Sequence, residues 1–435
     1  MRLEHLRSRL EELPLQRARG SVVQLVGDLV EAALPGVAVG TLCRIDDRFL
    51  AQVVGFREDR VLLMPLEPPR GVAYGAKVES TDGALSVSLG PELVGRVLDG
   101  LGRPADGGPP LRGACRRPIE GEPPDAMSRQ VIHEALPTGV RVLDSLLTLG
   151  RGQRVGIMAG SGVGKSTLMG MLARGSRADV NVICLVGERG REVREFVERD
   201  LGPEGMARSV LVVVTSDKSP VMQVKGAYTA VTIAEYFRDL GQDVLLMMDS
   251  VTRFAMAMRQ IGLAAGEPPT RGGYTPSVFG ALPRLLERAG PGQGQGSITG
   301  VYTVLVDGDD LHDPVGDAVR GIVDGHVVLS RKLAAHGHYP AVDVLQSVSR
   351  VMPAVTTPVH QGLARKIRAL LATWAENEEL VRLGAYRKGS SAEVDEAILR
   401  KPLIDTLLQQ AVTEHTPMEQ TLTAMRKITA RRKKG

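Results

Sequence analysis

A glycine-rich turn, AGSGVGKST at Ala159 to Thr167, combines residue types that hold phosphate groups. It follows a strand-like run, Arg154 to Met158, and leads into a helical pattern from Lys165 to Arg174. Glycines let backbone N–H groups converge on phosphate oxygens, and the helix N-terminus adds the positive end of its dipole. We expect Lys165 to reach the β- and γ-phosphates of ATP and Ser166 to ligate Mg²⁺. The predicted nucleotide-binding residues are Gly160, Ser161, Gly162, Val163, Gly164, Lys165, Ser166 and Thr167.

Two acidic residues at the ends of other apolar runs could complete a hydrolytic site. In DVLLMMDSVTR, Asp249 ends a strand-like run, where a carboxylate can hold the magnesium shell beside a phosphate loop. In GERGRE, Glu188 directly follows the run Val180 to Val186 and is the candidate that orients or deprotonates the attacking water. Taken alone, Asp249 could equally be an ordinary turn residue, and from the residues alone Glu188 could equally be a solvated acid in a charged loop.

Two arginines are candidates to stabilise negative charge on the γ-phosphate. Arg189 lies beside Glu188 in the same loop, and Arg350 follows another strand-like run in QSVSRVMP. From the residues alone, a surface salt bridge is the better interpretation of Arg350.

These residues need a sheet that brings them to one edge. Apolar runs alternate with helical patterns from Pro137 to about Val351, as expected for a mostly parallel sheet with helices on both faces. Short strand-like runs from about Gly20 to Leu89 predict a small β-barrel, and helical patterns follow Pro358. The predicted α/β architecture has four parts: an N-terminal helix at 1–18, a β-barrel domain at 19–95, a RecA-like P-loop domain at 96–355 and a C-terminal helical domain at 356–435.

Composition sets limits on the class of protein. The formal net charge of +4 over 435 residues does not by itself indicate a nucleic-acid partner. The three cysteines have no CxxC spacing, so neither a disulfide framework nor a zinc site is indicated and a cytoplasmic location is expected. The sequence has no apolar signal segment and no run approaching the ~20 apolar residues of a membrane span. Leucines at positions 3, 6, 10 and 13 form one stripe of the predicted N-terminal helix.

Several long motifs resemble one family. They are TGVRVLDSLLTLGRGQRVGIMAGSGVGKST, GERGREV, MMDSVTRFAMAMRQIGLAAGEPPTRGGYTPSVFGALPRLLERAG, DAVRGIVDGHVVLSRKLAAHGHYPAVDVLQSVSR and LVRLGAYRKGS, which together cover most of residues 137 to 390. The chain resembles the catalytic subunits of rotary ATP synthases and, more closely, the ATPases of flagellar and injectisome type III protein export.

The resemblance implies a homohexameric ring of ATP- and Mg²⁺-dependent subunits with active sites between neighbours. By motif position it implies the loop roles for Lys165 and Ser166, the water for Glu188, the magnesium shell for Asp249 and a phosphate contact for Arg189. It also implies that Arg350 acts in trans on a neighbour's γ-phosphate and that Tyr339, in GHYPA, lies beside the adenine; a core tyrosine at a turn is the alternative.

The function implied by the resemblance is a motor that releases chaperones and promotes substrate entry into an export channel. Implied partners are stator or stalk proteins, secretion chaperones and their cargo, with a peripheral position at the inner-membrane base of the apparatus and no nucleic acid. Two alternatives stay open: the catalytic subunit of a proton-translocating ATPase, and a nucleic-acid translocase similar to the terminator Rho. The Rho alternative requires a barrel with exposed aromatics and a basic groove, and residues 20–90 offer only Phe49, Phe56 and Tyr74.

Overall fold

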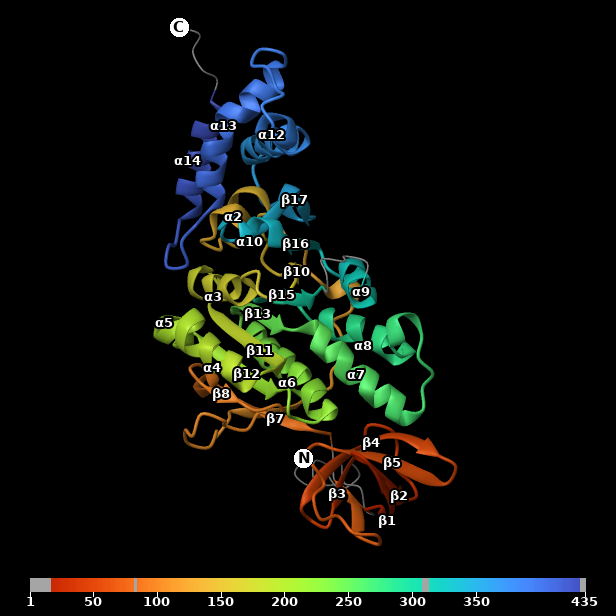
Figure 1. The fold of residues 1–435 in the computed structure, drawn as a ribbon. Helices are drawn as coiled ribbons and strands as arrows, with labels where there is room; N and C mark the ends of the chain where they lie inside the picture. Colours follow the sequence, from red (N-terminus) through yellow and green to blue (C-terminus); the bar gives the residue numbers. More distant parts are fainter. Residues whose placement is uncertain (1–16, 82–83, 307–312, 431–435) are drawn as a thin grey trace.

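The computed structural model describes residues 17–81, 84–306 and 313–430. Three regions lie in order along an elongated molecule: a β-barrel, a central sheet with helices, and a helical region that ends near the C-terminus (Figure 1). This order confirms the predicted fold class. The N-terminal helix predicted for residues 1–18 lies almost wholly outside the described residues, as does the basic C-terminal tail at 431–435.

The barrel is closed by six strands in the order β1-β2-β5-β4-β3-β6. Their bounds are β1 (Arg19–Val26), β2 (Leu29–Ala33), β3 (Leu42–Ile45), β4 (Phe49–Arg57), β5 (Arg60–Pro65) and β6 (Lys77–Ser80). Alternate apolar residues such as Val30, Ala51 and Val78 fill the interior, as the period of two along a strand requires. Closure leaves no unpaired strand edge within the barrel.

A connecting segment crosses from the barrel to the central domain. It contains β7 (Ser86–Leu89), η1 (Pro91–Leu93), β8 (Val97–Leu98), β9 (Cys115–Pro118) and η2 (Ala126–Ser128). This segment is rich in glycine and proline, yet it holds short strands, and β8 joins the edge of the central sheet beside β12. The buried Arg288 fastens the segment, because its NH1 donates to Ile119 O over 2.7 Å while its NH2 binds Glu235 at 2.6 Å.

The central sheet brings the carboxyl ends of its parallel strands to one edge. The strand order is β17-β16-β10-β15-β13-β11-β12-β8, and β17 runs antiparallel to β16. The bounds are β10 (Arg154–Ala159), β11 (Val180–Glu188), β12 (Ser209–Thr215), β13 (Asp243–Asp249), β14 (Gly290–Pro291), β15 (Ser297–Leu305), β16 (Gly325–Leu329) and β17 (Val342–Ser349). Nearly every residue of β11 and β15 is buried, as expected for strands covered on both faces.

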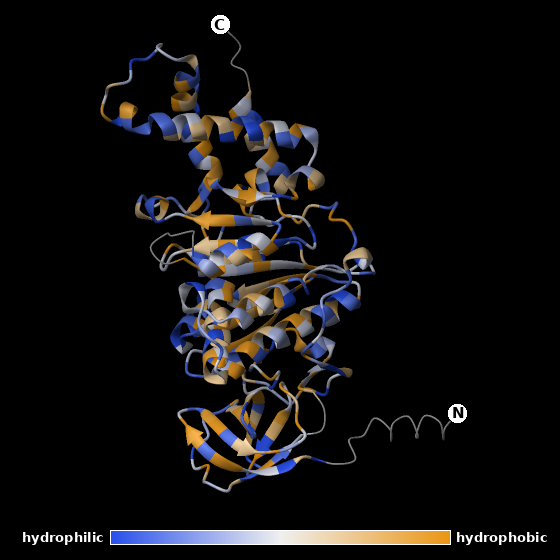
Figure 2. Cartoon of the chain, turned by 90° about the vertical axis from the view of Figure 1, so that its right-hand side faces the viewer, coloured by the Kyte–Doolittle hydropathy of each residue, from blue (hydrophilic) through white to orange (hydrophobic). Residues whose placement is uncertain are grey.

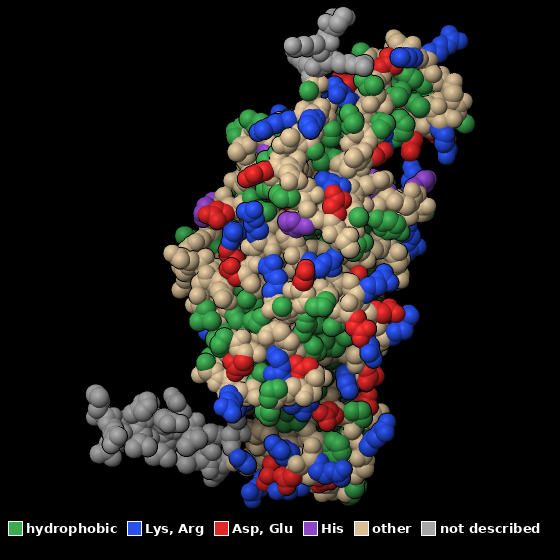
Figure 3. Space-filling view, turned by 90° about the vertical axis from the view of Figure 1, so that its left-hand side faces the viewer, with side chains coloured by type: hydrophobic (Ala, Val, Ile, Leu, Met, Phe, Trp, Pro, Cys, Tyr) green, Lys and Arg blue, Asp and Glu red, His purple; other side chains and the backbone are tan. Residues whose placement is uncertain are grey.

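Helices cover both faces of this sheet (Figures 1 and 2). They are α2 (Arg141–Leu146), α3 (Lys165–Gly175), α4 (Gly190–Glu195), η3 (Phe196–Leu201), α5 (Gly202–Met206), α6 (Pro220–Asp239), α7 (Val251–Ala265), η4 (Arg271–Gly273), α8 (Pro276–Leu286), α9 (Pro314–Ile322), α10 (Arg331–Ala335) and α11 (Met352–Val355). Charged side chains of both signs are interspersed over the face shown in Figure 3.

The C-terminal region consists of α12 (Pro358–Arg382), α13 (Ala392–Leu408) and α14 (Met418–Thr429). Helix α13 continues through Pro402, which lies inside it. Burial of Val394, Ala397 and Ile404 stabilises the helix on both sides of this proline. In the parts of the chain that the structure describes, no helix has the length and apolar character to cross a membrane.

Candidate active site

The predicted phosphate loop lies between β10 and α3, at the carboxyl edge of the sheet. Gly162 and Gly164 adopt φ values of +77° and +92°, in the left-handed region that favours glycine. Because Gly164 is the residue before the first turn of α3, the loop directs free N–H groups of the helix into a cavity of about 530 Å³. Val163 is buried and does not line this cavity. The other predicted loop residues line it: Gly160, Ser161, Gly162, Gly164, Lys165, Ser166 and Thr167.

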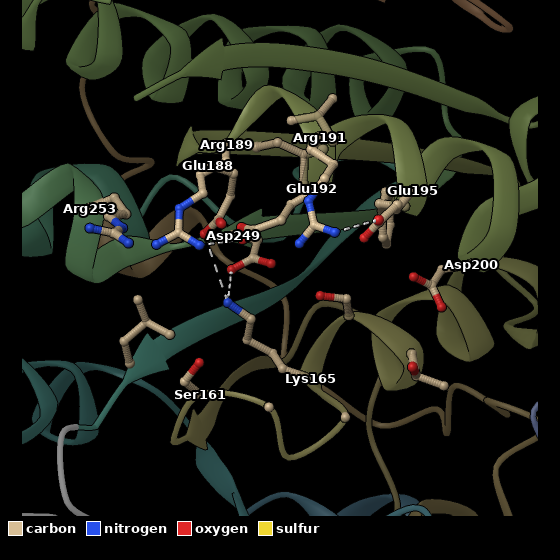
Figure 4. A pocket seen from close by; sticks show the side chains of 18 of the residues that line it. Ser161, Lys165, Glu188, Arg189, Arg191, Glu192, Glu195, Asp200, Asp249 and Arg253 are labelled. Atoms are coloured by element: carbon tan, nitrogen blue, oxygen red, sulfur yellow. Dashed lines mark hydrogen bonds and ion pairs between the residues drawn. The ribbon is translucent and has the colours of Figure 1, made fainter. Parts of the chain in front are cut away.

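Lys165 and Asp249 meet at the centre of the cavity (Figure 4). Lys165 Nζ donates to Asp249 Oδ1 over 2.6 Å, and the hydroxyl of Thr303 donates to the same oxygen over 2.7 Å. Asp249 is only 4 % exposed, so these two partners offset most of the cost of burying its charge. The structure therefore brings together the predicted lysine and carboxylate, and it adds Thr303, which the sequence did not indicate.

Glu188 ends β11 on the same side of the cavity, with its carboxylate 3.9 Å from Lys165 Nζ. Burial first, and then the nearby Asp249 carboxylate, raise the pKa of Glu188 to about 7 against the opposing charge of Lys165. A carboxyl group with a pKa near neutrality can exchange protons with water, as a general base requires. The cavity wall thus supplies a group that can act on a water molecule.

Arginines line the outer part of the cavity. Arg189 lies at its edge with a largely exposed side chain, and its NH1 is 3.1 Å from Glu192 Oε1. Arg253, on α7, also lines the cavity, and its buried Nε has no hydrogen-bond partner among the described residues. Sequence reasoning missed Arg253, although DSVTR places it four residues after Asp249, where the first turn of α7 returns it to the site.

The predicted adenine contact, Tyr339, lies beside the phosphate loop but does not line the cavity. A Cβ atom built on Gly164 would stand 3.7 Å from the Tyr339 ring, so ring and loop are in van der Waals reach. Tyr339 is 44 % exposed, and its backbone carbonyl accepts from Gln410 N over 2.9 Å. An exposed aromatic face next to a phosphate loop is available to stack on a base.

The structure does not bring Arg350 to the site of its own chain. Arg350 directly follows β17, and its backbone N–H donates to Asp324 O over 2.9 Å. Asp324 lies just before β16, level with Arg154 at the start of β10. From Arg154 to the phosphate loop at Ala159, β10 rises about 16 Å. Arg350 therefore lies at the opposite edge of the sheet from the cavity.

The donor atoms at the site suit a magnesium ion. A carboxylate from Asp249 and a hydroxyl from Ser166 are hard oxygen ligands, and few protein ligands are needed when phosphates and water supply the rest. Within residues 17–81, 84–306 and 313–430, no group of three or more His, Cys, Asp and Glu side chains is arranged to hold a metal on its own. This donor set therefore fits a metal that arrives with its nucleotide.

Family models describe nearly all of this architecture. The nucleotide-binding domain of the ATP synthase alpha/beta family matches residues 139–349, and the β-barrel domain of the same family matches residues 17–82. The chain belongs to the ATP synthase alpha/beta family. The C-terminal domain of the type III secretion ATPase EscN matches residues 356–427, which assigns the chain to the export branch of that family.

Individual relatives agree over the full length. The chain is 51 % identical to the flagellum-specific ATP synthase of Bacillus subtilis, over 99 % of both chains. It is also 51 % identical to the type 3 secretion system ATPase of Xanthomonas euvesicatoria, over 98 % of this chain and 97 % of the relative. The assembled ATPase EscN of enteropathogenic E. coli superimposes with a TM-score of 0.91 at 46 % identity, covering 94 % of this chain and 100 % of EscN. The protein is thus an ATPase of the flagellar and type III secretion group.

Proposed function

We propose that the protein is the ATP-hydrolysing motor of a type III protein export apparatus and works as a homohexameric ring. The observation that carries the ring is the placement of Arg350. The cavity holds Lys165, the phosphate loop and carboxylates that include Glu188 and Asp249, while Arg350 lies at the far edge of the sheet. An arginine at that edge can reach a γ-phosphate only on an adjacent copy. The solved structure of an assembled EscN, at 46 % identity, supports assembly of this chain as well.

In this proposal each side chain has one task. Lys165 neutralises the β- and γ-phosphates, and it leaves Asp249 to do so. Glu188, the group with a pKa of about 7, orients the attacking water and takes its proton. Arg189 contacts phosphate from within the same copy, and Tyr339 stacks on the adenine. Arg350 of the adjacent copy stabilises the charge that spreads over the transferred group.

A magnesium ion bound with ATP would be held by Ser166 directly and by Asp249 through its shell, where it would neutralise charge on the phosphates. Thr303 keeps Asp249 in place once Lys165 has turned toward the nucleotide. The residues of this chain therefore orient the ion from two directions, from the loop and from the end of β13.

The export role rests on the relatives and on the domain order. Residues 96–355 would hydrolyse ATP, while the barrel of residues 19–95 and the helices of residues 356–435 flank them along the axis of the ring. EscN has been solved in complex with its central stalk EscO, which supports a stalk partner for this chain. We propose that hydrolysis releases secretion chaperones and promotes cargo entry into the channel, at the membrane base of the apparatus. Flagellar and type 3 secretion relatives share the same 51 % identity, so identity favours neither system.

A secretion assay in the host tests this proposal. The Glu188→Gln variant, expressed at the normal level from its own locus, is expected to abolish hydrolysis and to reduce cargo in the culture medium strongly. The matched control is Glu195→Gln, an acid at the outer edge of the same cavity whose only described partner is the exposed Arg191. Normal secretion with the Glu188→Gln protein would contradict the export function.

A further inference from the structure

A buried glutamine joins three backbone segments next to Arg350. Gln153 is fully buried at the start of β10. Its Nε2 donates to Asp324 O over 3.1 Å and to Ser349 Oγ over 3.3 Å, and its Oε1 accepts from Gly150 N over 2.9 Å. One side chain therefore ties the turn before β10 to the residue before β16 and to the residue before Arg350.

Further contacts fix the backbone on both sides of this point. Asp324 O also accepts from Arg350 N over 2.9 Å, and Ser349 Oγ donates to Thr148 O over 2.8 Å. A Cβ atom on Gly325 would stand 2.4 Å from Val348 O, so only glycine lets β17 approach this closely. The backbone that carries Arg350 is consequently held by buried hydrogen bonds, which water cannot replace.

The guanidinium of Arg350 is held much less firmly. Its NH1 donates to Val323 O over 3.3 Å and its NH2 to Arg320 O over 3.4 Å, both long for N–H···O bonds. These carbonyls belong to the C-terminal end of α9, which attracts a cation weakly. The exposed side chain can leave them for a phosphate while its backbone stays fixed.

We propose that Gln153 is a positioning residue for the active site of the adjacent copy, because it sets the location of Arg350. The inference rests on the trans role given to Arg350 above. Strand β10 then serves two sites: its carboxyl end carries the phosphate loop of its own site, and its amino end anchors the arginine delivered to the next one. Displacing a catalytic group by about 1 Å can cost ~10²-fold in rate, so the anchor matters although it touches no nucleotide.

The test uses the Gln153→Met variant, which keeps the length of the side chain and removes its hydrogen bonds. We expect kcat to fall by about 10- to 100-fold, with the KM for ATP within about twofold, because nucleotide binding to its own loop is unchanged. Mixing with Lys165→Ala protein before ring assembly should restore activity, since those inactive subunits bring a correctly held Arg350 to intact Gln153→Met sites. A lesion confined to the variant's own phosphate loop would not be rescued by any partner.

Two further variants complete the test. Thr299→Val is the matched control: its buried hydroxyl accepts from Gly152 N over 2.9 Å at the same edge of the sheet but does not touch the Arg350 anchor, so kcat should stay near that of the native protein. Ser349→Ala removes the hydroxyl that accepts from Gln153 Nε2. If Gln153→Met fails to fold, Ser349→Ala takes its place in the test, with the same expected fall in kcat and the same rescue by Lys165→Ala protein. A normal kcat, or a low kcat without rescue, would overturn the role of Gln153. If Arg350→Ala itself is not rescued by Lys165→Ala, the trans arginine fails as well, and with it the proposed ring mechanism.

Discussion

Thr303→Val tests how the structure holds Asp249, the carboxylate that we propose for the metal shell. The hydroxyl of Thr303 donates to Asp249 Oδ1 over 2.7 Å, and Lys165 Nζ is the other partner of that oxygen at 2.6 Å. Valine keeps the branched shape of threonine on β15 and removes only the donor. In the nucleotide-free protein Lys165 neutralises Asp249. In the proposed mechanism Lys165 turns to the phosphates when ATP binds, and Thr303 alone then orients the carboxylate.

The expected effects on stability and on Mg²⁺ binding differ, because Asp249 has two partners without nucleotide and only Thr303 in the proposed ATP-bound state. A hydrogen bond to a charged group contributes about 1.5–3 kcal/mol, and Asp249 is too buried for water to replace it. Because Lys165 remains in place without nucleotide, we expect the free energy of unfolding to fall by only about 1 kcal/mol. Loss of a group that orients a metal ligand typically costs 10- to 100-fold in metal affinity, so the Mg²⁺ concentration for half-maximal activity should rise at least tenfold.

The assay is steady-state hydrolysis at fixed ATP with Mg²⁺ varied, accompanied by thermal unfolding without nucleotide. Thr299→Val, on the same strand and equally buried, serves as the control because its hydroxyl does not contact Asp249. An unchanged Mg²⁺ requirement in Thr303→Val, with folding intact, would refute the assignment of Asp249 to the metal shell.

Three other predictions concern stability and nucleotide affinity. Burial lowers the pKa of His360 below its ordinary value of about 6.5, so below that pH the unfolded chain takes up a proton that the folded protein resists. The free energy of unfolding should therefore fall as the pH drops below about 6.5, and it should fall less in His360→Gln. Thermal melts at several pH values would measure this. Arg288→Met, which removes a buried guanidinium and leaves the half-buried Glu235 without its cation, should cost about 3 kcal/mol in chemical denaturation, and the double variant with Glu235→Leu should recover most of it. Gln410→Ala removes the side-chain hydrogen bonds that fix the residue whose backbone N–H donates to Tyr339 O; it should raise the KM for ATP about fivefold with little change in kcat, and an unchanged KM would separate this segment from the nucleotide.

Local patterns in the sequence were sufficient for the phosphate loop, the barrel and the strand that ends at Asp249. In each case the residues that form the feature are neighbours along the chain, and their period or spacing reflects one element. Apolar character alone predicted the strand-like run that ends at Asp249, and in the structure this strand begins at Asp243. Tertiary packing decides such terminal residues more than local propensity does.

Contacts between distant segments could not be predicted in this way. Thr303 meets Asp249 because β15 and β13 are adjacent in the sheet, and no pattern near Thr303 shows this. The direction in which Arg350 faces depends on β17 running antiparallel to β16, which the apolar runs do not reveal. The single α13 helix is a similar case, because its buried face outweighs the local effect of Pro402.

The most direct test of the central claim, that each active site is completed by Arg350 of the adjacent copy, is a mixing titration. Arg350→Ala and Lys165→Ala proteins are each expected to be nearly inactive alone. They are combined before assembly at ratios that run from pure Arg350→Ala to pure Lys165→Ala, and hydrolysis per subunit is measured. If Arg350 acts in trans, activity rises to a maximum near equal amounts, where random assembly gives about a quarter of the sites both an intact Lys165 and an intact Arg350 from the neighbour. Activity that stays at the level of the separate variants at every ratio would contradict the account.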